Sequence, residues 1–366
     1  MKSEKIKVFA HLAYGQDLDH WARLRQQGKL IGSFESTPYG YDLANEMGCE
    51  VTFSKAYKQS LVGTAVRYAL RGLLGFDLAH ALSNSEKILE SDVVWTHTES
   101  QYLAVAMVFI LKGKTKTRPK LLGQSVWFFD TWQTLDPLRK AFYRHLIKYV
   151  DCMTVHSPLN LEKAREIFPL KDVQLVRYGI KALGFESPYV RQNKPHRLLC
   201  MGNDRHRDWK TVIGAFGGSS EYEVTIFSTT ASPRLAEGSD NIEIRGLKNN
   251  EELQDALMRS SLLVLPLKEN LHASGATVVQ QAVAAGLPVV ASNTGGLHAY
   301  FAEDEIEYVE PQSPQALRTA VDRVLNSPDN AIEKARRAQL RMTSGEIGVD
   351  AYIRDHVRIS QEMLER

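Results

Sequence analysis

Short apolar runs alternate with segments of helical periodicity along most of this chain. In the first half, the runs that read as strands are Lys7–His11, Glu50–Phe53, Val93–His97, Lys120–Gln124 and Cys152–His156. Between them, Leu61–Leu82 and Leu138–Val150 carry apolar residues at helical spacing. Strands separated by helices form βαβ units, so this alternation predicts a parallel sheet covered by helices.

A second series of the same kind begins after Gly179. Its predicted strands are Arg197–Met201, Val224–Phe227, Ile242–Ile244, Ser261–Leu265 and Leu287–Ala291, and its predicted helices are Trp209–Phe216, Glu251–Arg259 and Val278–Ala285. Residues 181–195 mix Gly, Pro and polar residues, which is typical of a linker. We therefore expect two α/β domains, 1–180 and 181–344, and a C-terminal helix at 345–366 that packs back on the first domain. Ligands bind beyond the carboxyl ends of such sheets, so the cleft between the two domains is the expected site.

Composition narrows the class of protein. The chain has 366 residues, which suits two domains, and its net charge of +2 does not favour nucleic acid as a partner. Cys49, Cys152 and Cys200 are widely separated and show no disulfide or metal-ligand spacing, so we expect buried thiols in a reducing cytosol and no metal site. No signal peptide precedes the first strand, and the longest apolar run is about half of a membrane span. These features predict a soluble, cytoplasmic protein.

The most informative segment is Leu263–Leu297, LVLPLKENLHASGATVVQQAVAAGLPVVASNTGGL. Its strand ends in a polar loop, and a helix starts near Ala276. Gly275 lets a ligand approach the backbone, and the free N–H groups of a helix start favour an anion. Gln281 lies one turn beyond Thr277 on a similar face, within reach of ribose hydroxyls. The polar loop also contains Glu269, His272 and Ser274, and the hydroxyls of Ser274 and Thr277 add hydrogen-bond donors to the predicted site.

A cluster of cations follows another predicted strand, which ends at Gly202. Arg205, Arg207 and Lys210 fall within six residues at the start of the next helix. Cations are unfavourable in the first turn of a helix, so the cluster predicts an anionic partner such as a nucleoside diphosphate. Arg205 and Arg207 are the first candidates to bind such a diphosphate. Lys210 is a further candidate for this role.

The first half offers candidates for a second substrate. His97 and Glu99 end one predicted strand, and Asp130 follows another among aromatic residues that include Trp127 and Trp132. Sugars stack on aromatic rings, and a partly desolvated carboxylate has a raised pKa, so Asp130 is a candidate general base. An aromatic core patch with Asp130 capping the next turn is the other interpretation.

One glycine of the first half is a further candidate. Gly40 lies in a loop that precedes the predicted helix Asp42–Met47. Gly40 could let the backbone of the first domain contact a phosphate group of the ligand expected in the second domain. A plain turn is the alternative interpretation.

Segment 263–297 resembles the donor-binding region of GT-B glycosyltransferases, specifically of glycosyltransferase family 4. That family shows Glu-x7-Glu-Ala, then Gly-x-Pro-Val-Val and a Gly-Gly loop. Here Gln281-Ala282 and Gly286–Val290 align with this pattern, while Ala273 and Gln281 replace the two glutamates. His272–Val278 resembles the variant loop of one branch. Gln281 can still hydrogen-bond the ribose, and Glu269 or His272 would take over the role of the first glutamate.

The resemblance extends to the cationic segment. Arg207 falls at the family's pyrophosphate lysine. Arg205 is the substitute for the family arginine, whose position holds Asn203. In retaining members the loop after Gln124 often carries a His that contacts the donor sugar. Asp130 is our substitute for that His.

The resemblance implies a GT-B fold of two facing Rossmann-like domains and a glycosyltransferase of hexosyltransferase type. The expected donor is a UDP- or GDP-linked sugar, and the expected acceptor is a glycan or lipid-linked saccharide in polysaccharide or glycolipid synthesis. Retention at the anomeric carbon, no cofactor and no divalent metal are also implied, in agreement with the lack of an Asp-x-Asp triplet. An inverting mechanism with Asp130 as base is an alternative. A sugar-nucleotide epimerase and a non-catalytic sugar-nucleotide-binding protein are alternatives from other classes.

Basic residues form two series in the first half, one at 112–120 and one on the helix that begins at Leu138. A solvated basic face is one interpretation. Attraction to an anionic membrane surface is the other, at about 1 kcal/mol per basic residue near the surface. The amphipathic segment Leu61–Leu82 is compatible with the second interpretation. The enzyme would then lie peripherally at the inner face of the membrane, where it would meet a lipid-linked acceptor.

Overall fold

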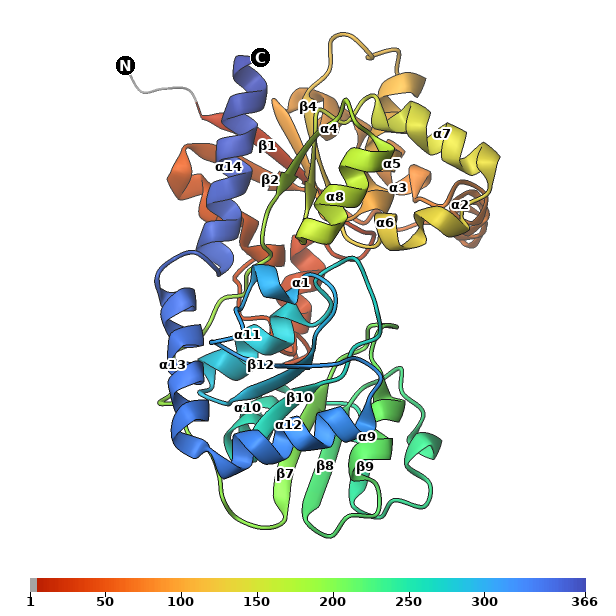
Figure 1. Cartoon of the computed structure of the whole chain (residues 1–366). Coiled ribbons are helices and arrows are strands. Elements are labelled where there is room, and N and C mark those ends of the chain that lie inside the picture. Colours follow the sequence, from red (N-terminus) through yellow and green to blue (C-terminus); the bar gives the residue numbers. More distant parts are fainter. Residues whose placement is uncertain (1–4) are drawn as a thin grey trace. The chain divides into compact units, whose positions relative to one another are not determined.

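The computed structural model describes residues 5–366 and divides into two compact units (Figure 1). Unit 1 comprises the described residues up to Leu24, Glu35–Val176 and Tyr352–Arg366. Unit 2 comprises Arg25–Phe34 and Arg177–Ala351. The short segment Arg25–Phe34 thus leaves the N-terminal half of the chain and belongs to the other unit, which the sequence patterns did not indicate.

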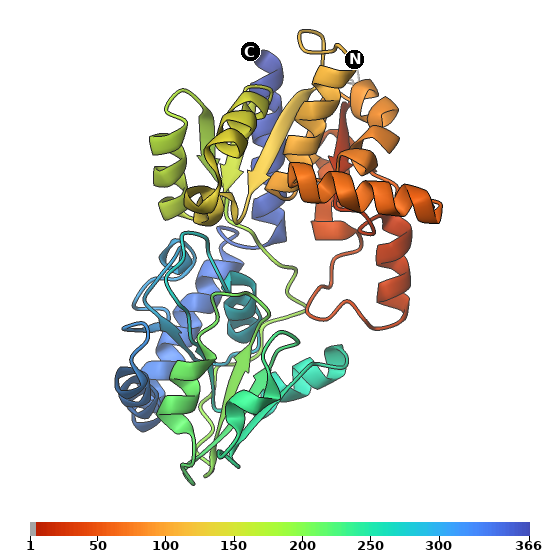
Figure 2. The same ribbon diagram turned by 90° about the vertical axis from the view of Figure 1, so that its right-hand side faces the viewer.

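Unit 1 contains a six-stranded parallel sheet in the order β2-β1-β3-β4-β5-β6 (Figures 1 and 2). The strands are β1 Ile6–His11, β2 Cys49–Phe53, β3 Val93–Thr96, β4 Lys120–Ser125, β5 Cys152–Val155 and β6 Asp172–Leu175. In the register, Val8 of β1 pairs with Val51 of β2 and with Val93 of β3. The strand order reverses direction at β1, and open α/β sheets bind ligands at the carboxyl ends of the strands beside such a reversal.

Helices cover this sheet, and their apolar faces form the core of unit 1. They are α1 Leu18–Gln26, η1 Pro38–Met47, α2 Leu61–Leu74, α3 Leu78–Ser83, α4 Ser85–Glu90, α5 Glu99–Leu111, α6 Phe128–Thr131, η2 Trp132–Thr134, α7 Pro137–Ile147, α8 Pro158–Ile167 and α14 Val349–Glu365. The C-terminal α14 packs on the sheet, where Trp95 donates a hydrogen bond of 2.8 Å to Ser360. The expectation of one helix over Leu61–Leu82 is wrong, because Gly75 ends α2 with a left-handed φ of 84°.

Unit 2 repeats the architecture with the order β12-β11-β10-β7-β8-β9. Its strands are β7 His196–Met201, β8 Tyr222–Phe227, β9 Ile242–Arg245, β10 Leu262–Leu265, β11 Val289–Ser292 and β12 Glu307–Val309. The first strand, β7, lies between β8 and β10, so the order again reverses at the first strand. Loops that follow β7 and β10 therefore meet at the carboxyl edge.

The helices of unit 2 cover both faces of its sheet. They are α9 Trp209–Phe216, η3 Pro233–Ala236, α10 Asn250–Arg259, α11 Ala276–Ala284, η4 Leu297–Ala299, α12 Pro314–Asn326 and α13 Pro328–Thr343. Successive residues of β7 point to opposite faces, so Leu198 and Leu199 belong to different core clusters. All four residues of β10 are buried, as expected for a central parallel strand.

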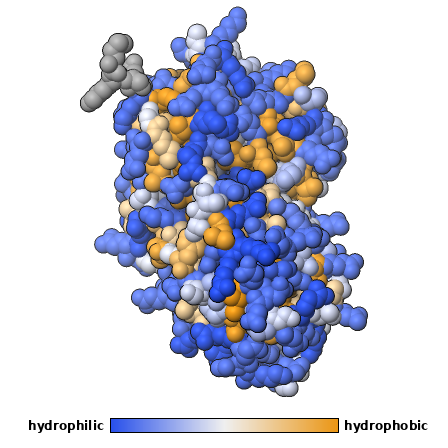
Figure 3. Space-filling view, turned by 60° about the vertical axis from the view of Figure 1, so that its left-hand side comes forward, coloured by the Kyte–Doolittle hydropathy of each residue, from blue (hydrophilic) through white to orange (hydrophobic). Residues whose placement is uncertain are grey.

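The predicted α/β fold of two Rossmann-like units is confirmed by these two parallel sheets. The predicted cleft between the units stays a prediction. Over residues 5–366, no helix is both long and apolar enough to cross a membrane. Hydrophilic residues predominate on the face that Figure 3 shows, with apolar residues interspersed among them.

Candidate functional site

The guanidinium of Arg207 lies buried at the carboxyl edge of the unit 2 sheet. Its side chain donates hydrogen bonds to the backbone oxygen of Met201 (3.1 Å) and to the hydroxyl of Ser274 (2.7 Å). The residue is only 6% exposed. Burial lowers the pKa of Arg207 to about 10, so the group still carries its charge at neutral pH. The position matches our expectation that Arg207 faces the Ser274–Gly275 loop.

Two glycines make room for this guanidinium. A Cβ on Gly202 would lie 2.3 Å from Nε of Arg207, and a Cβ on Gly275 would lie 3.3 Å from its Nη1. Both glycines also have left-handed backbone angles, with φ of 135° and 85°. Only glycine fits these two positions without displacing the arginine.

The start of α11 lies next to the arginine. Gly275 is the N-cap residue, and no side chain of the described chain caps this helix start. The first N–H groups of an uncapped helix attract an anion. The predicted members Ser274 and Ala276 are buried, and Thr277 is partly buried. The buried cation of Arg207 therefore lies beside the start of α11.

Three polar side chains that sequence reasoning did not combine lie beside this point. Asp204 accepts hydrogen bonds from His206 Nδ1 and from His272 Nε2, both at 3.0 Å. Burial alone would raise the pKa of the Asp204 carboxyl, but the hydrogen bonds from His272 and His206 hold that pKa well below its usual range. The ligand atoms of the three residues lie within 4.8 Å of one another, so this group could hold a divalent cation. In the structure, both oxygens of Asp204 are instead used by the two histidines.

A pocket of about 250 Å³ adjoins the arginine on the side of β8 and β9. Its lining combines apolar with polar side chains and includes Gly202, Asn203, Phe227, Ser228, Leu247, Leu253, Thr277 and Gln281. A mixed lining of this kind suits a base and a sugar hydroxyl. Met201 and Gly202, which lie against Arg207, line one side of this pocket.

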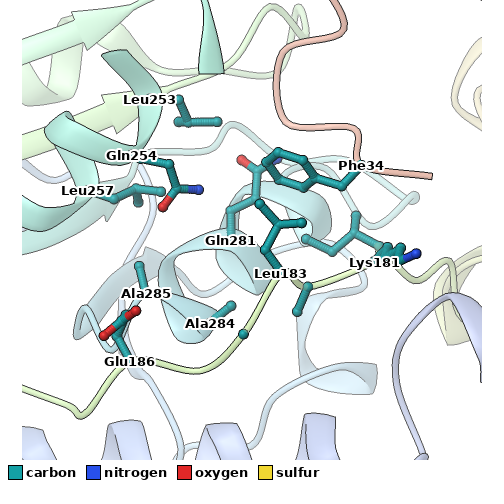
Figure 4. Close-up of a pocket in the computed structure, with 13 residues that line it drawn as sticks. Phe34, Lys181, Leu183, Glu186, Leu253, Gln254, Leu257, Gln281, Ala284 and Ala285 are labelled. Carbon is teal, nitrogen blue, oxygen red and sulfur yellow. The ribbon is translucent and has the colours of Figure 1, made fainter. Parts of the chain in front are cut away.

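Segment Arg25–Phe34 borders this pocket. Asn250 accepts from the backbone N–H of Gly32 (2.8 Å) and donates to the carbonyl of Leu30 (3.0 Å). The Gln281 amide also donates to the carbonyl of Gly32, at 3.0 Å. Gln281 and Phe34 both line a second pocket, of about 120 Å³ (Figure 4). The predicted contact of Gln281 with a ribose thus stays a prediction, because its N–H group is used within the chain.

The other predicted donor residues differ in exposure. Arg205, Lys210 and Glu269 are exposed, and His272 is buried against Asp204. Ala273 and Gln281, which stand at the family's glutamate positions, bring no carboxylate to this loop. The assignment of Glu269 or His272 to the role of the first glutamate stays a prediction.

In unit 1, the predicted residue His97 belongs to a buried polar network at the carboxyl ends of the strands. Its Nδ1 accepts from the amide of Gln124 and contacts the hydroxyl of Tyr41, each at 3.2 Å. Tyr41 and Tyr352 share a hydrogen bond of 3.0 Å between their hydroxyls. Burial, with His156 and His356 nearby, holds the pKa of His97 well below its usual range. The ring is therefore neutral at pH 7.

The predicted acceptor residues after β4 do not share one environment. Trp132 is 3% exposed and its ring centre lies 5.1 Å from that of Phe128, in the aromatic core. Trp127 is 40% exposed, and Asp130 is partly buried in α6. Glu99 accepts from the backbone N–H of Val126 and so fixes the end of β4. Of the two tryptophans, Trp127 alone presents an accessible ring.

Gly40, the remaining predicted residue, is buried in unit 1 within η1. Its neighbour Tyr39 has a left-handed φ of 59°, which is strained for a residue with a side chain. The ring of Tyr39 stacks on His97 with 3.4 Å between the centroids. Sequence reasoning did not identify Tyr39, Tyr41 or Asp204. Of these three residues, only Asp204 could have been found from the sequence, because it follows the end of a predicted strand and precedes His206 by two residues.

The two parallel sheets define a GT-B architecture of two Rossmann-like units, and the buried Arg207 lies at the carboxyl edge of the second sheet. The structure of sucrose-phosphate synthase from Thermosynechococcus elongatus has the same fold, with a TM-score of 0.70 and 15% identity over 98% of this chain and 99% of that chain. Anabaena Alr3699/HepE in complex with UDP and glucose gives a TM-score of 0.66 and 10% identity over 98% of this chain and 100% of that chain. A glycosyltransferase from Rickettsia africae gives 0.65 and 12%, over 99% of both chains.

Residues 217–341 match the sequence model of the family glycosyl transferases group 1. The match covers about a third of the chain and includes α11 and its N-terminal loop. A search of curated protein sequences found no match to this chain. The family match and the fold together support a glycosyltransferase.

Proposed function

We propose that this glycosyltransferase takes its sugar from a UDP- or GDP-linked donor and transfers it to a hydroxyl of a saccharide or lipid-linked saccharide. The observation that carries the proposal is the buried guanidinium of Arg207 between Gly202 and Gly275, beside the start of α11. Its hydrogen bonds go to neutral oxygens, and the nearby Asp204 carboxylate, which already has two histidine partners, offsets only part of the effect of burial on the pKa of Arg207. A buried cation is costly without an anion, and a diphosphate supplies two to three negative charges that suit a guanidinium.

The proposed pose places the diphosphate between Arg207 and the first amides of α11. The nucleoside then occupies the pocket of about 250 Å³, with its ribose near Gln281. HepE, which has a similar fold, holds UDP and glucose in its structure. When the bond between the anomeric carbon and the diphosphate breaks, the electron pair leaves with the diphosphate. Arg207 and the helix start stabilise that growing charge.

The acceptor side of the proposal rests on unit 1, with Trp127 as the stacking ring and Asp130, His97 and Glu99 as polar partners. The proposed outcome is retention at the anomeric carbon. If Asp130 instead takes the acceptor proton as a general base, the configuration inverts. Product stereochemistry, read by nuclear magnetic resonance of the anomeric proton, separates these two mechanisms.

Ligand binding tests the donor site. Thermal unfolding would be followed with UDP, GDP, ADP and their common sugar conjugates. A ligand at 100 times its dissociation constant adds about 2.7 kcal/mol to the free energy of unfolding. We expect UDP or GDP to raise the melting temperature in the wild type and less so in Arg205→Ala. No shift with any nucleotide would overturn the proposal.

Turnover tests the reaction class. We expect sugar transfer to a saccharide acceptor, followed by release of the nucleoside diphosphate. Binding without turnover over a broad acceptor panel would instead support a non-catalytic binding protein. Epimer formation from the donor alone would support a sugar-nucleotide epimerase.

Metal independence is also part of the proposal. Arg207 would supply the positive charge that a divalent cation supplies elsewhere, and Asp204 already has histidine partners on both oxygens. We therefore expect turnover to persist after treatment with EDTA. Loss of turnover in EDTA that zinc or manganese restores would assign a metal to Asp204, His206 and His272.

A further inference from the structure

Helix α2 exposes its apolar side chains to solvent. Leu61 is 91% exposed, Val62 73%, Val66 51% and Leu73 71%. At 100° per residue these positions, together with Ala65 and Ala69, fall on one arc of the helix. Leu138, at the start of α7, is 84% exposed. We call Leu61, Val62, Val66, Leu73 and Leu138 the α2 face.

The helix is held to unit 1 by its opposite, polar flank. Arg67, the buried residue of α2, forms a 2.7 Å ion pair with Asp77 and lies 3.6 Å above the ring of Tyr14. At the C-terminal end, Arg139 and Tyr143 donate to the carbonyls of Leu73 and Leu74. Arg139 follows Leu138, so these hydrogen bonds bring the start of α7 next to the end of α2. Figure 2 looks onto the side of unit 1 on which α2 lies.

The charges on α2 and on the segment just before it are of one sign, whereas Asp136, two residues before Leu138, is an exposed carboxylate at the edge of the α2 face. No Asp or Glu occurs between Ser54 and Phe76, whereas this stretch contains Lys55, Lys58, Arg67 and Arg71. Lys55, Lys58 and Arg71 are exposed. The basic series at 112–120 contributes less free positive charge, because Arg118 is partly buried and forms a 2.6 Å ion pair with Asp151.

We propose that the α2 face docks on the surface of an anionic lipid bilayer. An apolar arc flanked by lysine and arginine matches the interface, where apolar side chains enter the acyl boundary and long basic side chains reach the phosphate headgroups. Headgroup phosphates also supply the negative charge that the stretch from Ser54 to Phe76 lacks. No helix among residues 5–366 could span the membrane, so α2 would lie in the interface plane.

The α2 face also lies near the predicted acceptor edge of unit 1. Tyr14, which Arg67 covers, follows β1, and α7 follows β4 through α6. The predicted acceptor residues His97 and Trp127 follow β3 and β4. A docked α2 would therefore bring a lipid-linked acceptor to the carboxyl edge of the sheet. This last step rests on the proposed function, whereas the docking itself does not.

Vesicle flotation of the full chain tests the docking. The probes are vesicles of phosphatidylcholine alone and of phosphatidylcholine with an equal amount of phosphatidylglycerol. We expect the chain to float with the mixed vesicles, less so as salt screens the charges, and weakly with phosphatidylcholine alone. Leu61→Glu with Leu73→Glu should lower the partition coefficient by tenfold or more, since each buried leucine contributes about as much as a tenfold change in binding.

Matched controls keep the test specific. Leu170→Glu changes an equally exposed leucine, at 101%, outside the α2 face, and should float as the wild type does. Arg71→Gln should weaken flotation, and the exposed Arg165→Gln on α8 should not. Circular dichroism confirms that each variant is folded. Because the surface leucines are solvent-exposed, their replacement should leave the melting temperature unchanged.

Two outcomes would overturn the proposal. One is equal flotation of the wild type and the Leu61→Glu, Leu73→Glu variant. The other is absence of flotation with a concentration-dependent dimer that the same variant abolishes, which would make the α2 face an interface between two copies. Nucleotide binding by the flotation-defective variant, measured separately, distinguishes failure of docking from failure of the proposed function.

Discussion

At the scale of single residues, the buried Arg207 organises the candidate donor site. Lysine carries the same charge but has no planar fork of N–H groups, so it cannot reach Met201 and Ser274 together. The loop glycines confirm how closely the fork is enclosed. The charge therefore acts from a fixed position, which is what stabilisation of a leaving group requires.

Replacement of the fork should weaken nucleotide binding. We expect Arg207→Lys to lower the affinity for UDP or GDP by roughly tenfold to a hundredfold, which corresponds to the loss of one charged hydrogen bond. Isothermal titration calorimetry measures the effect. Arg234→Lys, an exposed arginine of η3, is the matched control. Wild-type affinity in Arg207→Lys would remove this residue from the site.

Gly275 should tolerate no side chain. A Cβ there would lie 2.6 Å from Leu265 Cδ2 and would press on Arg207. We expect Gly275→Ala to lower the free energy of unfolding by about 2–4 kcal/mol, through backbone strain and overpacking. Gly238 has a similar φ of 83° and open space around it, so Gly238→Ala should cost only the strain, about 1 kcal/mol. Urea unfolding measures both variants. If Gly275→Ala and Gly238→Ala lose the same free energy of unfolding, the close packing around Gly275 is contradicted.

Asp204 should stabilise the fold in a pH-dependent way. The histidine hydrogen bonds hold its pKa below the unfolded value of about 3.9, so the ionised form is favoured in the folded state. Its contribution is therefore present above about pH 4 and is lost as the pH falls toward the folded pKa. We expect Asp204→Asn to destabilise by about 2 kcal/mol at pH 6 and by less near pH 3.

Urea unfolding at both pH values measures the difference for Asp204→Asn. The exposed Asp240→Asn serves as the control. A loss in Asp204→Asn that grows toward pH 3 would contradict the assigned direction of the pKa shift.

At the scale of elements, apolar periodicity predicted the central strands well because those strands are buried on both faces. The edge strands β2 and β9 were also predicted, but the edge strands β6 and β12 were missed because they are short and partly exposed and carry no apolar run. The break at Gly75 was missed because apolar spacing continues across it. Sequence spacing also could not bring Tyr41 beside Tyr352, since the contact joins positions 311 residues apart.

The donor site was easier to predict than the acceptor site. Its residues follow β7 and β10, which are neighbours in the strand order that βαβ repeats favour, so two local motifs were enough to find Arg207 and Gly275. The acceptor residues lie in an aromatic environment, which looks the same in sequence for a core and for a sugar platform. Burial separates the two: Trp132 belongs to the core and Trp127 does not.

Segment Arg25–Phe34 should be held on unit 2 chiefly by Asn250. We expect Asn250→Ala to raise the amide exchange rate of this segment by roughly tenfold, since it removes two hydrogen bonds of about 1 kcal/mol each. Hydrogen–deuterium exchange read by mass spectrometry follows the peptide. The exposed Asn326→Ala at the end of α12 is the control. Unchanged protection of this segment in Asn250→Ala would show that its other contacts, such as the hydrogen bond from Gln281 to Gly32, hold it on unit 2 without Asn250.

At the scale of the whole molecule, the chain is not divided at a single linker. Unit 1 needs the last turns of the chain, because Tyr352, Ile353 and Ile359 are fully buried in it. Unit 2 in turn includes ten residues from the N-terminal half, Arg25–Phe34. Neither unit therefore corresponds to a continuous piece of sequence.

Truncation should show this dependence. A chain that ends at Ala351 loses most of α14, and each large apolar side chain removed from the core costs about 1.5–3 kcal/mol. We expect this chain to be insoluble or to lack the near-ultraviolet dichroism of a packed unit 1. A chain that ends at Leu364 removes only two exposed residues and should keep the wild-type melting temperature. A soluble, cooperatively unfolding chain that ends at Ala351 would contradict the role of α14.

The position of α14 also sets an order of events on the ribosome. The strands of the first sheet are translated early, yet the helix that completes their core is translated after every other element of residues 5–366. The second sheet, although made later, already has every segment it needs before α14 emerges. Nascent chains stalled while α14 is still inside the exit tunnel should therefore protect the second half from protease while the first half is still cleaved.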